Sequence, residues 1–167
     1  MTKNINIFFG VNQITIDLTD EEVGQPQIQF VARLIEGEFP DYQAIIPASY
    51  ATSIVFSKKE LLNHLKSASL FAGKGNEVNV KIKEKDAAML ISSQSTDLGD
   101  YESEMKLDKV AGGDINIAFN YRFLIDGLNS IKNDKCVFEF SNDEGPGVLK
   151  PESEDGFIYI LMPIKKY

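Results

Sequence analysis

The sequence predicts an α+β fold in which a strand–helix–three-strand unit occurs twice. After Pro47, a strand at 50–56 leads into a helix and three further strands, and the same order restarts at residue 114. Both helices carry apolar residues at helical spacing, and the strands are short runs rich in β-branched and aromatic residues. We expect the two helices to pack side by side on one face of antiparallel sheets.

Three strands and no helix are predicted for the first part of the chain, at 4–10, 14–19 and 28–37. An acidic loop with Gly24 and Pro26 separates the second strand from the third. Three strands alone bury little apolar surface. We therefore expect them to pack on another structure or on a second copy.

The first repeated unit follows a strand with a helix at 57–72. Ser57 is the expected N-cap, and Glu60 stands at the spacing of a capping box. Strands are predicted at 77–83, 87–94 and 101–107. One helical stripe carries the residues expected to face the core, Leu61, Leu62, Leu65 and Ala68.

The second unit begins with a strand at 114–119, and Asn120 is the expected N-cap of a helix at 120–132. Strands are predicted at 135–140, 147–150 and 157–163. The last strand is apolar at every position from 157 to 162, which is typical of a strand covered on both faces. Met162, Pro163 and Ile164 then lead to the surface, where a methionine adapts well to varied partners.

Composition predicts a soluble, cytoplasmic protein with one domain and part of another. The chain has 167 residues, of which 43% are hydrophobic, and no apolar run reaches the length of a membrane span. The start of the chain is polar and lacks the pattern of a signal peptide. Its single cysteine, Cys136, lies in an apolar strand, so we expect a buried thiol without chemistry.

The charge is spread unevenly along the chain. The net charge is −8, which argues against a simple nucleic-acid binder. The two helical segments are nevertheless mildly basic, at +2 for 57–72 and +1 for 120–132, which leaves −11 for the remainder.

No group of residues assembles a catalytic centre. The one histidine, His64, lies in a helical segment without a second histidine or cysteine to complete a zinc site. The glycine-rich segment 72–76 lacks the spacing of a phosphate-binding loop and is expected to be a turn after the helix. We expect no catalytic residue, no metal and no cofactor.

The segment 33–47, RLIEGEFPDYQAIIP, is the most specific part of the sequence. Its glycine and two prolines exclude a helix interior or a central strand, yet its residues 39–46 include four large apolar or aromatic groups, Phe39, Tyr42, Ile45 and Ile46. It resembles the connector between the second and third domains of the bacterial sliding clamp, the DNA polymerase III beta subunit. The runs at 114–132 and 156–167 resemble the last helix and last strand of that family. The resemblance implies a DNA-clamp fold, with 1–47 as the end of the middle domain plus the connector and 48–167 as the complete C-terminal domain.

The resemblance also implies a function. Such a clamp is a processivity factor, a non-catalytic homodimeric ring that encircles duplex DNA. It tethers the DNA polymerase III catalytic subunit, the clamp loader and repair polymerases through short peptides of the Gln-Leu-x-Leu-Phe type. Phe123 stands where many relatives have tyrosine, and Ala44 where some have arginine. The residues that would form the peptide pocket are Pro40, Ile45, Asn120, Phe123, Pro146, Ile160, Met162, Pro163 and Ile164.

Further roles are carried over by position from the same family. The cations that would face DNA are Lys58, Lys59, Lys66 and Arg122, and the residues at the ring interface are Leu70 and Phe71. An acidic protein can hold DNA in this way because the ring retains it topologically, with a mildly basic inner wall.

Two other interpretations stay open. The chain could be a free-standing, clamp-like adaptor that binds replication peptides without encircling DNA, and a natural start at Met1 would favour this reading. It could also be a small enzyme whose catalytic residues do not form a recognisable pattern. The second half of the family's peptide site comes from an earlier part of the middle domain, so peptide binding by this portion is expected to be weak.

Overall fold

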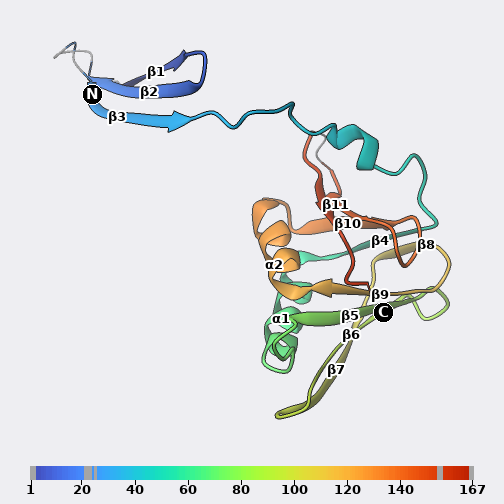
Figure 1. Ribbon diagram of the computed structural model, residues 1–167. Coiled ribbons are helices and arrows are strands. Elements are labelled where there is room, and N and C mark those ends of the chain that lie inside the picture. The colour runs from blue at the N-terminus through green and yellow to red at the C-terminus, as the bar shows by residue number, and fades with distance from the viewer. Residues whose placement is uncertain (1–2, 21–23, 25, 154–155, 166–167) are drawn as a thin grey trace. The chain divides into compact units, whose positions relative to one another are not determined.

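The computed structural model describes residues 3–20, 24, 26–153 and 156–165, and the chain forms two compact units (Figure 1). The first unit ends at Asp41 and the second begins at Tyr42, so the division falls within the connector 33–47. Among the described residues, no helix has the length and apolarity needed to cross a membrane.

The N-terminal unit is a three-stranded antiparallel sheet in the order β1–β2–β3. Its register aligns Ile7 with Ile16 and Ile16 with Phe30, so one face of the sheet is apolar, while Asp17 and Gln29 are hydrogen-bonded on the other. No described residue of this unit is buried. The three predicted strands are confirmed, with the bounds β1 Lys3–Phe9, β2 Gln13–Asp20 and β3 Pro26–Arg33.

The C-terminal unit contains two antiparallel sheets and two helices, which confirms the predicted fold class. The five-stranded sheet has the order β12–β11–β10–β4–β8, and the four-stranded sheet has the order β7–β6–β5–β9. The elements, in chain order, are η1 Tyr42–Ile45, β4 Thr52–Ser57, α1 Lys58–Ser69, β5 Glu77–Lys83, β6 Ala88–Ser95, β7 Gly99–Lys106, β8 Lys109–Gly112, β9 Ile115–Asn120, α2 Tyr121–Ser130, β10 Lys135–Phe140, β11 Gly147–Pro151 and β12 Tyr159–Leu161.

The two repeated units exchange their first strands. β4 precedes α1 but pairs with β10 of the second unit, and β9 precedes α2 but pairs with β5 of the first unit. Each sheet is therefore completed by a strand from the other repeat. Both helices contribute to the same buried cluster, so the two repeats share one core.

The predicted caps are confirmed at both helices. The Glu60 N–H donates to Ser57 Oγ at 3.4 Å, and the Arg122 N–H donates to Asn120 Oδ1 at 3.0 Å. The helices are shorter than predicted because each ends where the chain turns back towards the core. Ile131, which follows α2, adopts an extended conformation and is buried.

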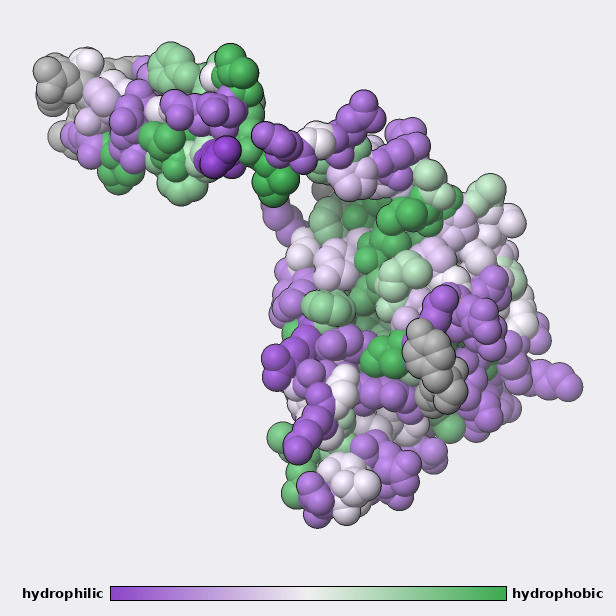
Figure 2. All heavy atoms as spheres, in the orientation of Figure 1, coloured by the Kyte–Doolittle hydropathy of each residue, from purple (hydrophilic) through white to green (hydrophobic). Residues whose placement is uncertain are grey.

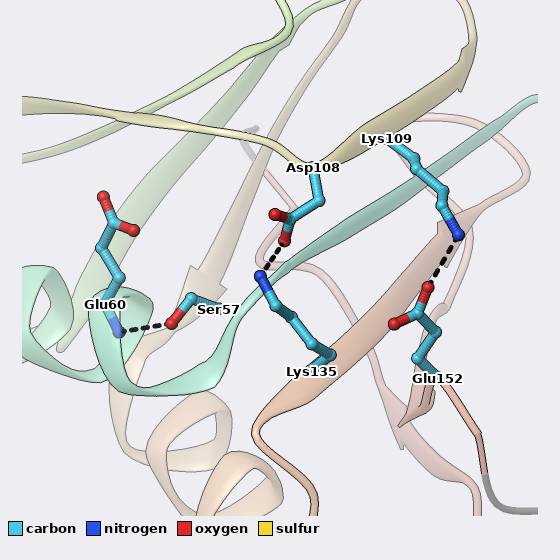
Figure 3. Close-up of polar contacts among 6 residues, drawn as sticks. All are labelled: Ser57, Glu60, Asp108, Lys109, Lys135 and Glu152. Atoms are coloured by element: carbon cyan, nitrogen blue, oxygen red, sulfur yellow. Dashed lines mark hydrogen bonds and ion pairs between the residues drawn. The ribbon is translucent and has the colours of Figure 1, made fainter.

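Strand β8 was absent from the sequence prediction because Lys-Val-Ala-Gly is short and has no clear alternation. It pairs with β4, and two ion pairs hold it, Lys135 Nζ to Asp108 Oδ2 at 2.6 Å and Lys109 Nζ to Glu152 Oε1 at 2.8 Å (Figure 3). Gly112 ends the strand with φ +106°, and a Cβ there would lie 1.8 Å from the Ala51 carbonyl oxygen.

Aromatic side chains fill the centre of the core. The rings of Phe119, Phe138 and Phe140 lie 4.3 to 6.4 Å apart between their centroids. Cys136 is fully buried beside them, and burial raises the pKa of its thiol to about 11. His64 Nδ1 lies 2.9 Å from Ser103 Oγ, so the histidine contributes to packing between α1 and β7.

Candidate functional site

The edge strand β12 exposes an apolar strip. Leu161 is buried, and the Tyr159 ring packs against Gly127 of α2, so these two side chains face the core. Because side chains alternate along a strand, Ile158, Ile160 and Met162 face the opposite surface. Met162 is 61% exposed. This corrects the prediction of a strand covered on both faces: β12 lies at the sheet edge, and one of its faces is open.

The chain after β12 crosses from one sheet to the other. Pro163 has no N–H to continue the ladder, and the Ile164 N–H instead donates to the Ala118 carbonyl of β9 at 2.8 Å. Ala118 stands two residues before Asn120, the N-cap of α2. Phe123 lies in the first turn of that helix and is 57% exposed. The C-terminal segment therefore runs beside the start of α2.

Two further predicted residues lie in the same unit. Pro146 directly precedes Gly147, which pairs with Leu161, so Pro146 lies next to Met162 at the end of the β11–β12 pair. Ile45 ends η1 and is 52% exposed. Figure 2 shows a band of hydrophobic residues on the C-terminal unit, between η1 and the C-terminal segment.

Eight of the nine predicted pocket residues thus lie in the C-terminal unit, on strand ends, turns and a helix N-terminus. Pro40 belongs to the N-terminal unit, and the peptide-binding role of all nine residues stays a prediction.

A cavity of about 390 Å³ lies beside the C-terminal segment. Pro163 and Ile164 form one wall, and Asp143, Glu144 and Lys165 supply charged groups. The strip and the cavity together offer apolar contacts with polar groups at the rim, an arrangement that suits an extended peptide with apolar anchors.

The predicted DNA-facing cations differ in their surroundings. Lys59, Lys66 and Arg122 are exposed on the two helices. Lys58 is engaged instead: its Nζ donates to the Ile131 carbonyl at 2.7 Å and so ties the start of α1 to the end of α2. Arg122 lies over the Tyr121 ring, with its Cζ 6.0 Å from the ring centroid.

The two predicted ring-interface residues also differ in their surroundings. Leu70 is 68% exposed, whereas the Phe71 ring stacks on Tyr101 of β7 at 5.8 Å. A second cavity, of about 780 Å³, lies between the end of α1 and the β6–β7 turn, where Leu70 and Leu98 are both exposed.

Comparison with known proteins identifies the family. Residues 43–165 match the family model described as DNA polymerase III beta subunit, C-terminal domain. The chain belongs to this family of sliding clamps. The clamp family is non-catalytic, in agreement with the prediction that the chain carries no catalytic residue.

Curated relatives and solved structures extend the likeness over nearly the whole chain. The chain is 31% identical over 165 residues to the beta sliding clamp of Staphylococcus aureus, and the match covers 99% of this chain and 42% of the relative. The crystal structure of the DNA polymerase III beta chain from Streptococcus pneumoniae TIGR4 has a TM-score of 0.83 at 30% identity, covering 97% of this chain and 41% of that one. The Bacillus subtilis sliding clamp shares the fold, with a TM-score of 0.84 at 24% identity and coverages of 98% and 41%. The chain therefore spans about 42% of the length of the curated clamps it matches.

Sequence reasoning missed several residues around the strip of this clamp domain. Val148 faces Ile160 across the β11–β12 pair and is buried on the outer side of the sheet. An ion pair between Glu139 and Lys150 lies on the same face, near Tyr50. The alternation within β10 and β11 could have placed these residues on one face, but the sequence alone does not indicate which strands are neighbours.

Proposed function

We propose that this chain is the C-terminal part of a replicative sliding clamp, a processivity factor that encircles duplex DNA as part of a larger ring. The observation that carries the proposal is the open apolar strip of β12 and the segment after it, in a domain that matches the clamp family. A strand edge with exposed Ile158 and Met162 is costly in water unless a partner covers it for part of the time.

The partners we propose are short linear peptides of the DNA polymerase III catalytic subunit, the clamp loader and repair polymerases. An extended peptide with large apolar side chains would lie along Ile160 and Met162. Its end would reach Pro163, Ile164 and the exposed Phe123. Each fully buried anchor contributes about 1.5–3 kcal/mol, against several kcal/mol for ordering the peptide.

DNA would be held by the ring as a whole. In the assembled protein, a cytoplasmic homodimer, the exposed Lys59, Lys66 and Arg122 would screen phosphates across the two helices. Leu70, in the cavity beside the β6–β7 turn, would contact the next subunit. Lys58 would act mainly as a structural tie because its ammonium already binds a carbonyl.

A peptide-binding adaptor that does not encircle DNA is the alternative function. The apolar strip of β12 carries this alternative as well, because it lies within the C-terminal unit and does not depend on a ring. Joining the chain to the preceding part of the Staphylococcus aureus clamp tests this alternative. A closed dimer that stays on circular DNA supports the clamp function, whereas a soluble hybrid that binds peptide but never closes supports the adaptor.

The peptide site is tested by fluorescence anisotropy with a labelled Gln-Leu-x-Leu-Phe peptide. We expect saturable binding at high micromolar to millimolar concentration, about −4 to −6 kcal/mol. Met162→Ala should abolish saturable binding in the accessible concentration range. Leu98→Ala, which shortens an equally exposed side chain on the β6–β7 turn, should leave it unchanged. Equal losses in both variants would contradict the proposed site.

A further inference from the structure

An ion pair flanks the apolar strip on the outer face of the five-stranded sheet. Lys150 Nζ lies 2.8 Å from Glu139 Oε2. The register aligns Glu139 with Val148 and Val148 with Ile160, so all three share one face. Lys150 stands two residues after Val148 on β11, the strand that pairs with β12, and therefore points to the same face. Lys150 is thus the charged residue next to the Ile158 end of the strip.

The two members of the pair differ in their access to solvent. The Glu139 side chain is 13% exposed, whereas that of Lys150 is 36% exposed. Burial raises the pKa of the Tyr50 phenol, Glu139 adds to this rise and Lys150 opposes it, so Tyr50 lies within electrostatic reach of both charges. The Lys150–Glu139 contact is an ion pair without hydrogen-bond geometry. An ammonium has three N–H donors, so Lys150 is able to bind an added acceptor.

The opposite end of the strip carries the other sign of charge. Asp143 and Glu144 lie just before Pro146, in the cavity beside Pro163, where Lys165 is the accompanying cation. A carboxylate on a bound peptide would be repelled by the two acidic residues at that end. At the end near Ile158 it would meet the Lys150 ammonium.

We propose that Lys150 is a specificity-determining residue that binds a carboxylate of the docked peptide, next to the apolar anchor held by Ile158 and Ile160. This inference rests on the proposed function of the strip. The carboxylate is either an Asp or Glu side chain or the C-terminus of the peptide itself. Glu139 competes for the same ammonium, so it limits the strength of this contact.

The Lys150 side chain is about a third exposed, so the effect of the contact is modest. A carboxylate next to the anchor should tighten binding about two- to fivefold over a neutral group. Salt should reduce this preference because the ion pair is accessible to solvent.

Three peptides with the same apolar anchor separate the possible sources of the carboxylate. One continues with Gln and ends in an amide, one continues with Glu and ends in an amide, and one ends after the anchor with a free carboxylate. Anisotropy titrations against the whole chain should rank at least one acidic peptide above the neutral one. Lys150→Met should abolish that preference, and Glu139→Gln should enlarge it because the ammonium loses its competitor. Lys109→Met is the matched control: Lys109 is also paired, with Glu152 at 2.8 Å, but lies on β8 at the opposite edge of the sheet, so the preference should persist.

The outcomes separate this inference from the proposed function. Equal affinities for all three peptides, or a preference that persists in Lys150→Met, would overturn the role of Lys150 while leaving the peptide site intact. A smaller preference in Glu139→Gln would show that the pair only braces the sheet. If the Lys150→Met variant does not fold, the ranking of the three peptides on the unmodified chain and on Glu139→Gln still tests the role of Lys150. Absence of binding by any peptide would overturn both proposals.

Discussion

Gly127 of α2 and Tyr159 of β12 are in direct contact. A Cβ built on Gly127 would lie 2.6 Å from Cδ1 and 2.8 Å from Cε1 of the tyrosine ring. The ring occupies the space that a side chain on the helix would take. This contact turns Tyr159 towards the core and, by strand alternation, turns Ile158 and Ile160 outwards.

Gly127→Ala tests whether this contact positions β12. Alanine at an interior helical position is normally favourable by about 1 kcal/mol. Here the ring must move, and overpacking of this kind costs about 1–3 kcal/mol, so we expect a net loss of stability and weaker peptide binding. Urea unfolding and peptide titration measure the two effects. Gly113→Ala, where no atom lies within 4 Å of the added Cβ, is the control. Adding Tyr159→Leu to Gly127→Ala should restore part of the lost stability, and no recovery would show that the clash is not the cause.

Lys58→Met tests the tie between the two helices. The Lys58 Nζ donates to the Ile131 carbonyl at 2.7 Å, and the loss of this bond should lower the free energy of unfolding by about 0.5–1.5 kcal/mol. Lys59→Met removes the same charge from the next, exposed position and should change stability much less. Equal effects from the two substitutions, measured by urea unfolding, would contradict a structural role for Lys58.

Cys136 predicts a pH dependence of stability. Its thiol has an ordinary pKa of 9.0 and a folded pKa of about 11, caused mainly by burial. Between these values the unfolded chain has lost the proton that the folded chain keeps. The free energy of unfolding should therefore fall as pH rises from about 9 towards about 11. Urea unfolding across this range should show a steeper fall for the unmodified chain than for Cys136→Ala. Identical slopes would show that the thiol titrates alike in both states.

The chain alone should bind duplex DNA weakly. Its net charge is −8, and only a few exposed cations lie on the two helices, so few phosphate contacts are available. In anisotropy titrations near physiological salt we expect no saturation below about 100 µM, since non-specific affinity falls steeply with salt. Sub-micromolar affinity would contradict the view that DNA is retained by a closed ring.

Much of the fold could be predicted from local patterns. The helix caps at Ser57 and Asn120 depend on neighbouring residues, and so does the alternation in most strands. Both were predicted correctly. The exchange of β4 and β9 between the sheets was not predicted, because it depends on pairing between distant segments. Strand β8 is too short to show alternation, and its pairing with β4 and its ion pairs, which join distant segments, hold it in place. The unbroken apolar run at 157–162 also concealed that β12 is an edge strand.

For the candidate site, family likeness suggested residues that local patterns could not. The residue types of Met162 and Pro163 were enough to predict that the last strand ends at the surface. The neighbourhood of Val148, Glu139 and Lys150 depends on the order of strands in the sheet, so it became visible only in the structure. The peptide-binding role of all nine pocket residues stays a prediction.

The most direct test of the central claim is an NMR titration of isotope-labelled chain with a Gln-Leu-x-Leu-Phe peptide. We expect saturable shifts that centre on β12, the segment through Ile164 and the first turn of α2, with a Kd between about 0.1 and a few millimolar. Met162→Ala should remove these shifts while the rest of the spectrum stays folded. Shifts that centre on α1, or no shifts at millimolar peptide, would contradict the assignment of this surface.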